Sequence, residues 1–350
     1  MTIDTIYERA CTNGDVGDKL MASGFDPGVL RPFVGKDHRH YITANGKTMV
    51  HNGPATLRHE DWLDLDRAIV KEARPRLQIV SDLRAAGLTY GVKGGMGKTV
   101  LQTETQTKAG TATISMDGIR MGDTDRPHFA TGLLPLPIIH EDFEMSLRQI
   151  EASRNGTPLD LTMAEEAARN VADEAEKLTI GLKSPHYGGG VVYGMINSPA
   201  RLTASVRNPS TYANWVPKMA VHDVLAMRDV SKANNHRGPW MLYCGPSWDT
   251  YLDEDYSDEK GSNTLRERLE KIKGIDGIET LDFLTGYDMV LVQKTSNVIR
   301  LVIGMEMTTL QWDSHGGLMK HFKVMMIIVP QIRADAANQT GIAHASAVDA

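Results

Sequence analysis

The residues most suggestive of chemistry lie at 92–99, VKGGMGKT. A Lys-Gly-Gly-x-Gly-Lys-Thr run is the pattern of a deviant phosphate-binding loop, in which backbone N–H groups and a helix N-terminus cradle phosphates. Such a loop needs a buried strand before it and a helix after it. GLTYGV before it alternates like a half-exposed strand, and VLQTETQTKAGTATISMDG after it favours an extended hairpin. We therefore interpret Gly94, Gly95 and Gly97 as a bend where a strand leaves its domain, with a nucleotide-binding ATPase as the remote alternative.

No other group of residues forms a convincing catalytic or metal-binding pattern. The acidic stretch at 253–261, DEDYSDEKG, lacks the Gly and the Glu that a calcium loop needs at its sixth and twelfth positions. His38 and His40 have no third ligand at a suitable spacing. DSH at 313–315 lacks the G-x-S-x-G elbow of a hydrolase. We therefore predict that the protein is not an enzyme and has no catalytic residues, cofactor or metal.

Length and composition restrict the class of protein. The chain has 350 residues, of which 41% are hydrophobic and 23% are charged, with a formal net charge of −6. A core of good size and one to three domains are expected, and the acidity disfavours a basic nucleic-acid-binding surface. No apolar run reaches the roughly 18 residues of a membrane span, and the N-terminus lacks a secretory signal. Cys11 and Cys244 are too few for a disulfide framework, so we expect a soluble protein of a reducing compartment.

Helices and strands are intermixed, which predicts an α+β fold. The spacing of apolar residues predicts a helix over 59–74, ended by Pro75. A second and longer helix, here called the spine helix, follows Thr162 and Glu165, which form a capping-box pattern, and Gly181 is placed to end it. The residues predicted to pack along one face of the spine helix are Ala164, Ala168, Val171, Ala175 and Leu178. HFKVMMIIVPQIRAD, near the C-terminus, predicts a long apolar strand followed by a polar tail.

The order of these features resembles a known family. GPATLRHEDWLDLDRAIVKEARPRLQIVSDLRAAG is similar to the opening of encapsulin shell proteins, with a proline-containing arm, a Trp-bearing helix and an Arg-rich stretch. LPIIHEDFEMSLRQIEASRNGTPLDLTMAEEAARNVADEAEKLTIG, RGPWMLYCGPSWDTYL and NVIRLVIGMEMTTLQW are similar to later blocks of the same family. Over roughly residues 53–333, the chain thus resembles the major capsid proteins of tailed bacteriophages and the encapsulins, which share the Hong Kong 97-type fold.

The resemblance implies a division of the chain into named parts. We expect an N-terminal arm, a peripheral domain in several pieces around the spine helix, an extension loop over the adjacent subunit, and an axial domain at the five-fold and six-fold centres. The expected boundaries are 1–57 for the arm, 58–97 and 137–190 for the peripheral domain, 98–136 for the extension loop, 191–305 for the axial domain, 306–334 for a peripheral return strand and 335–350 for a C-terminal tail. Gly94, Gly95 and Gly97 become the hinge of the extension loop, needed for shell assembly.

The resemblance also implies a function. It predicts a virion protein that self-assembles, in the host bacterial cytoplasm, into pentamers and hexamers of an icosahedral phage head around double-stranded DNA, without sequence-specific binding or membrane contact. Separate scaffolding, portal and decoration proteins are further expected partners. The alternative is an encapsulin nanocompartment shell around a cargo enzyme. The long N-terminal arm and the ending VPQIRADAANQTGIAHASAVDA favour the phage capsid protein.

Overall fold

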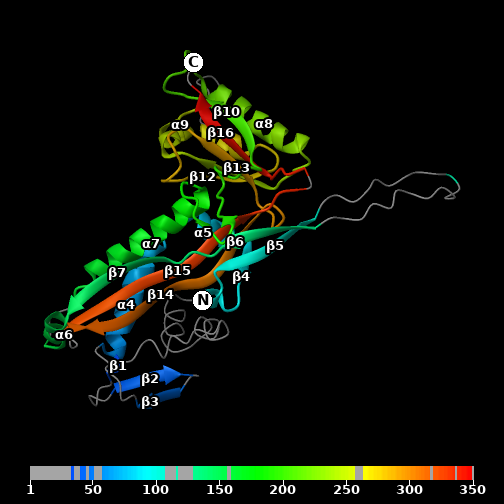
Figure 1. Ribbon diagram of the computed structural model, residues 1–350. Helices are drawn as coiled ribbons and strands as arrows, with labels where there is room; N and C mark the ends of the chain where they lie inside the picture. The colour runs from blue at the N-terminus through cyan, green and yellow to red at the C-terminus, as the bar shows by residue number, and fades with distance from the viewer. Residues whose placement is uncertain are drawn as a thin grey trace.

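The chain folds into two lobes, each built around its own β-sheet (Figure 1). The computed structural model describes residues 33–34, 40–44, 47–50, 57–106, 116, 129–155, 159–256, 263–315, 318–335 and 337–348. One lobe is elongated and contains a four-stranded sheet; the other is more compact and contains a five-stranded sheet. Both lobes combine helices with their sheets, so the predicted α+β class is confirmed.

The elongated lobe depends on one long antiparallel hairpin. Its strands are β14 (Ile299–Ser314) and β15 (Met319–Ile332), and the sheet order is β4-β14-β15-β7, with β4 at Thr89–Gly91 and β7 at Ile139–Ser146. The predicted apolar strand is β15. All its residues from Val324 to Val329 are buried, because core side chains cover both faces of the sheet there. A strand buried on both faces reads as a continuous apolar run.

Helices cover one face of this sheet. They are α4 (His59–Ala73), α5 (Gln78–Ala85) and α7 (Thr162–Ile180), while the short α6 (Leu147–Arg154) lies at the far end of the lobe (Figure 1). Trp62 of α4 meets the ring of Phe322 in β15 edge-on, and Phe322 stacks on Phe143 of β7 at a centroid distance of 5.0 Å. These rings fix the angle at which α4 lies on the sheet.

The spine helix α7 packs through small side chains. Its five predicted packing residues are at most 4% exposed: Ala164, Ala168, Val171, Ala175 and Leu178. Alanine lets the helix approach α4 and the sheet closely. Gly181 ends the helix with a left-handed φ of 107°, as predicted. The predicted capping box is wrong: Leu161 is the N-cap, and Asp160 accepts hydrogen bonds from the Thr162 amide and hydroxyl at 3.0 and 2.7 Å.

The compact lobe holds a mixed sheet of order β10-β16-β13-β11-β12. Its strands are β10 (Leu202–Arg207), β11 (Trp240–Cys244), β12 (Ile275–Thr280), β13 (Met289–Gln293) and β16 (Ile342–Val348). They pack against α8 (Pro217–Ala233), η2 (Pro246–Trp248), α9 (Asp249–Asp253) and α10 (Leu265–Glu270).

Two expectations about the C-terminal part of the chain are corrected. Residues 342–348, expected in a tail over 335–350, form β16 and pair with β10 and β13 on its two edges. Its inward residues are mostly alanine, so the stretch lacks the large apolar side chains that mark a central strand. Residues 299–305, expected in the axial domain, begin β14 and pair with β15 and β4 in the other sheet.

The described part of the expected N-terminal arm is a small antiparallel sheet. It consists of β1 (Phe33–Val34), β2 (His40–Ala44) and β3 (Lys47–Val50). The Val34 amide donates to the Leu57 carbonyl at 2.9 Å, which joins this sheet to the start of α4. Residues 1–32 lie outside the described residues.

A buried carboxyl group joins two of the helices. Glu176 of α7 is 2% exposed, and its Oε1 accepts the Val80 amide at 3.1 Å, so it caps the N-terminus of α5, where Leu77 offers no side-chain cap. Burial raises the pKa of Glu176 to about 8, and Asp173 one turn earlier adds to the effect, although the amides of α5 lower it. Between the ordinary pKa of a glutamate and about pH 8, the Glu176 carboxyl is therefore protonated in the folded protein and ionised in the unfolded chain.

We expect the stability of the protein to fall as the pH rises from 5 to 8, because the folded state binds one proton more than the unfolded state in this window. Glu176→Gln keeps an oxygen that accepts the α5 amides and removes the charge. The substitution should flatten this part of the pH dependence and raise the unfolding free energy at pH 8 by roughly 2–4 kcal/mol. Urea unfolding at pH 5, 6, 7 and 8 measures both effects. Parallel profiles for the two proteins would contradict the assignment.

Candidate assembly surface

The glycine loop is a tight turn between two strands. After β4, the Val92 amide donates to the Ile303 carbonyl at 2.9 Å, and Gly94 takes a left-handed φ of 67°. A single 3-10 turn, η1 (Gly95–Gly97), follows, and Lys98 is already extended. The chain then enters strand β5 (Val100–Gln106). A phosphate-binding loop needs a helix N-terminus at this point, so the loop lacks that geometry and the extended hairpin predicted after it is confirmed.

The three glycines are present for different physical reasons. Gly95 is buried, and a Cβ atom on it would lie 2.3 Å from the carbonyl oxygen of Gly304 in β14. Gly94 needs its positive φ, whereas Gly97 has open space where a Cβ would be. Gly304 lies where the pairing of β14 with β15 shifts register, so the loop base is seated on an irregularity of the long hairpin. Gly95 is therefore a fixed contact, and of the three expected hinge positions only Gly97 is free of steric constraint.

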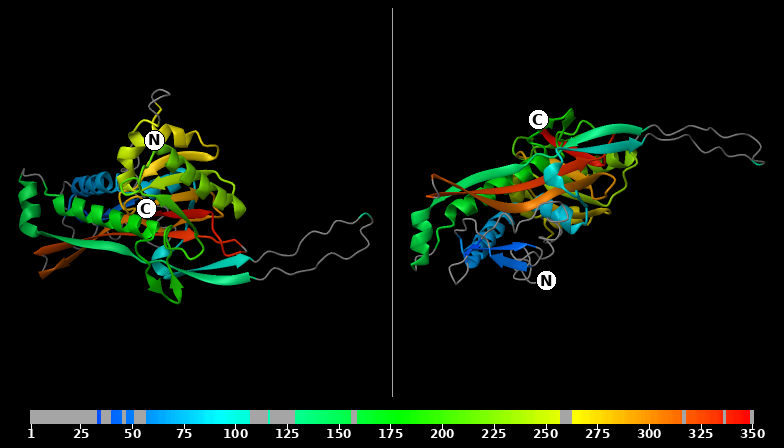
Figure 2. Two further views of the ribbon diagram at one scale, coloured as in Figure 1. Left: turned by 90° about the horizontal axis from the view of Figure 1, so that it is seen from above. Right: turned by 60° about the horizontal axis from the view of Figure 1, so that its bottom comes forward.

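The expected extension loop begins as a two-stranded hairpin. β5 pairs with β6 (Phe129–Pro135) from Val100 opposite Pro135 to Gln106 opposite Phe129. The Leu136 amide donates to the Thr99 carbonyl at 2.9 Å and closes the base. The hairpin projects sideways from the elongated lobe in every view (Figures 1 and 2). Apart from Met116, residues 107–128 lie outside the described residues.

Several large apolar side chains in the segments at the root of this hairpin are exposed. Strand β9 (Gly190–Val191), which pairs with β8 (His186–Tyr187), lies against β6, and a Cβ on Gly190 would lie 2.3 Å from the Leu133 carbonyl oxygen. Leu133 is 42% exposed and Tyr187 is 59% exposed. The root patch, as we call it, consists of Leu133, Ile138, Leu182, Tyr187 and Tyr193. The patch was missed in the sequence, although the run of three glycines at 188–190 signals that the backbone there approaches another strand.

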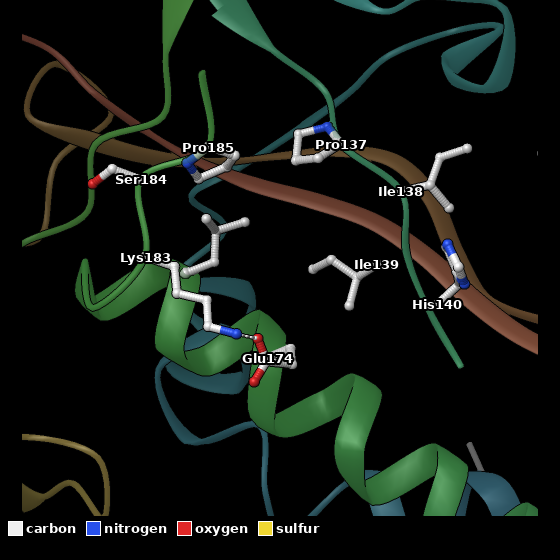
Figure 3. A pocket seen from close by; sticks show the side chains of 9 residues that line it. Pro137, Ile138, Ile139, His140, Glu174, Lys183, Ser184 and Pro185 are labelled. Atoms are coloured by element: carbon white, nitrogen blue, oxygen red, sulfur yellow. Dashed lines mark hydrogen bonds and ion pairs between the residues drawn. The ribbon is translucent and has the colours of Figure 1, made fainter. Parts of the chain in front are cut away.

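A shallow depression lies beside the root patch, between the segment after β6 and the end of α7 (Figure 3). Pro137, Ile138 and Ile139 form one side, and Pro185 approaches from the other. Glu174 of α7 is hydrogen-bonded to Lys183 and, at 3.0 Å, to Lys177. Burial opposes ionisation of the Glu174 carboxyl, but these hydrogen bonds outweigh it and lower its pKa.

The depression therefore has an apolar wall, and at its rim the charge of Glu174 is compensated by its hydrogen bond with Lys183. Such a surface suits an apolar segment of another chain better than a polar small molecule. Within the described residues, His, Cys, Asp and Glu side chains form no group of three that could hold a metal ion, and no helix is long and apolar enough to cross a bilayer.

A family comparison matches residues 52–345, most of the chain, to the model described as "Family of unknown function (DUF6260)". No curated protein matches the sequence.

Solved structures share the fold at low sequence identity. The virus-like particle from Pyrococcus furiosus is 15% identical, with a TM-score of 0.57 over 81% of this chain and 98% of that chain. The capsid of Myoviridae phage XM1 is 10% identical, with a TM-score of 0.55 over 75% and 90% of the two chains. The structure from Mycobacterium phage Bobi is 14% identical, with a TM-score of 0.53 over 77% of this chain and 90% of that chain. The chain therefore has the Hong Kong 97-type fold that the sequence predicted.

Gly95→Ala should destabilise the subunit by about 1–3 kcal/mol, because the added methyl group meets the backbone of Gly304 and one strand must shift. Gly97→Ala should change the free energy of unfolding little, since its φ is ordinary and the site is open. Thermal or urea unfolding of the two variants beside the wild-type protein measures the difference. Equal stabilities of the Gly95 and Gly97 variants would show that the β4–β5 turn does not depend on this contact.

Proposed function

We propose that this chain, which belongs to the DUF6260 family, is the repeating subunit of a closed protein shell. The observation that carries the proposal is the fold: the match extends over 98% of the Pyrococcus furiosus particle subunit and 90% of the phage XM1 capsid chain. Sequence identities of 15% and 10% support a common architecture, but they do not assign a role to any particular residue of this chain.

The shape of the subunit supports this function. The β5–β6 hairpin extends away from its own lobe, and the root patch exposes five large apolar side chains at its base. Several large apolar side chains exposed around one structural feature of a protein indicate an interaction surface. In a shell, a projecting hairpin spreads the contacts of one subunit over several neighbours, and many modest interfaces together hold a closed particle.

Within this function, we favour the major capsid protein of a tailed bacteriophage. Pentamers and hexamers would form an icosahedral head around double-stranded DNA, assembled in the host bacterial cytoplasm, with scaffolding, portal and decoration proteins as separate partners. The net charge of −6 would keep most of the shell wall from binding the packed phosphates tightly. The expected arm, peripheral, extension-loop and axial parts belong to this proposal, with the C-terminal strand β16 now assigned to the axial sheet.

A nanocompartment shell around a cargo enzyme is the second candidate. The match to 98% of the virus-like particle subunit from Pyrococcus furiosus supports a shell of either kind. The two candidates differ in what the shell contains, since the capsid protein would enclose nucleic acid and the compartment would enclose a protein.

Sedimentation of the purified chain, with electron microscopy of the fastest fraction, tests the shell. We expect closed particles of megadalton mass, or rings of five and six subunits where assembly needs a scaffold. A monomer or dimer at every concentration, salt and pH would contradict the proposal. Nuclease-resistant double-stranded DNA in particles from the native source would identify a capsid, and a co-purifying enzyme inside them would identify a compartment.

We expect Leu133→Ser combined with Tyr187→Ser to impair assembly and leave the subunit folded. Leu133 is 42% exposed and Tyr187 is 59% exposed in the subunit, and fully burying a large apolar side chain at an interface contributes up to about 1.5–3 kcal/mol. The critical concentration for particle formation should therefore rise at least about tenfold. Met163→Ser, an exposed apolar position at the start of α7, is the matched control. Light scattering against concentration gives the comparison, and equal values for the double variant and the control would exclude the root patch from the interface.

A further inference from the structure

Two arginines lie together on one face of the four-stranded sheet. Arg300 of β14 is directly opposite Gln331 of β15, and Arg333 follows two residues after Gln331. The Arg333 amide donates to the Val298 carbonyl at 2.8 Å, so the ladder continues to this point. Paired residues and residues two apart share a face of a sheet, which makes Arg300 and Arg333 diagonal neighbours.

Neighbouring side chains hold the Arg300 guanidinium in a fixed position. Its centre lies 4.3 Å from the ring centroid of Tyr90 in β4, and its Nε donates to Oε1 of Gln331. Stacking on an aromatic ring leaves the edge of the planar group free to donate further hydrogen bonds. The guanidinium of Arg333 is exposed, and within the described part of the chain its only hydrogen bond is a long one of 3.5 Å to the Ser296 carbonyl.

The two positive charges have no negative partner among the described residues. Neither guanidinium forms an ion pair there, whereas Arg207 binds Asp223 and Arg169 binds Glu72 at 2.8 Å. Burial lowers the pKa of Arg300, and the nearby charge of Arg333 lowers it further. Two like charges held side by side are unfavourable unless an anion lies between them.

We propose that Arg300 and Arg333, with Tyr90 and Gln331 as their support, form an oxyanion site that binds a phosphate group. Two guanidinium forks can each donate a pair of hydrogen bonds, and the several oxygens of a phosphate can accept from both. Inorganic phosphate can carry two negative charges, and a nucleic-acid backbone presents a series of singly charged phosphates, so either can compensate both arginines, whereas one isolated carboxylate compensates only one of them. This binding site does not depend on the proposed shell function, because phosphate binding can be measured on free subunits as well as on assembled particles.

The phosphate could be a free ion or part of a nucleic-acid backbone, and two titrations of the full chain distinguish these sources. Inorganic phosphate is titrated calorimetrically in a chloride buffer of constant ionic strength. A short double-stranded DNA of arbitrary sequence is titrated by fluorescence anisotropy at two salt concentrations. Saturable binding of inorganic phosphate indicates a free-ion site. Binding of the DNA alone, weakened by salt and equal for unrelated sequences, indicates backbone recognition.

Arg300→Gln and Arg333→Gln should each weaken the observed binding at least about tenfold, because each removes one charged fork. Arg300→Lys should weaken it as well, since lysine keeps the charge and loses the stacked planar fork. Arg148→Gln, an exposed arginine of α6 with no ion pair among the described residues, is the control and should bind as the wild-type protein does. Thermal unfolding of each variant verifies that it is folded.

Two results would overturn the site. The first is wild-type protein that saturates with neither probe; if the Arg300 and Arg333 variants then change only the association of subunits, the pair faces a carboxylate of a second copy. The second is an Arg148 variant that loses as much affinity as the Arg300 and Arg333 variants.

Discussion

Burial of the long strand β15 on both faces is the constraint on which the rest of the elongated lobe depends. One face of the strand receives the helices, through Phe322 and Val324, and the other face, from Met325 onward, receives Leu134 and Leu136 from the hairpin root. β15 is also paired along both edges, with β14 and β7. Because every side of the strand is occupied, the spine helix on one face and the projecting hairpin on the other keep a fixed relation to each other.

The compact lobe is held to this frame by apolar side chains of β11, β13 and β16 that join the core of the elongated lobe, and by a small polar group of residues. Asp82 of α5 accepts a hydrogen bond from the Tyr243 hydroxyl in β11 and one from Lys294 at 2.6 Å. Burial raises the pKa of Tyr243, and the carboxylate of Asp82 raises it further, so the hydroxyl stays a donor. Lys177 of the spine helix also lies 5.2 Å from the ring of Phe283 in the compact lobe. Directional contacts of this kind fix an orientation more precisely than apolar packing does.

Features with a strong local signal could be predicted from the sequence. The alanine face of the spine helix, its end at Gly181 and the apolar run of β15 follow from spacing and side-chain type. The strand after the glycine loop could be predicted because a Thr-rich segment does not favour a helix. Three features could not. β16 has few large apolar residues, Gly95 is explained only by Gly304 in a strand roughly two hundred residues further along the chain, and the proximity of Arg300 and Arg333 depends on the register of a long hairpin.

The position of β16 has a consequence for the order in which the subunit matures. This strand separates β10 from β13, so the five-stranded sheet cannot close until residues 342–348 have been synthesised. Before that moment, β10 and β13 each expose an unpaired edge, and exposed edges invite pairing with other chains. The elongated lobe depends on the same part of the chain, because its strand β15 ends at Ile332 and Ile342 of β16 belongs to its apolar core. A subunit truncated before residue 342 would therefore leave β10 and β13 with open edges and would also lose a buried side chain from the core of the elongated lobe.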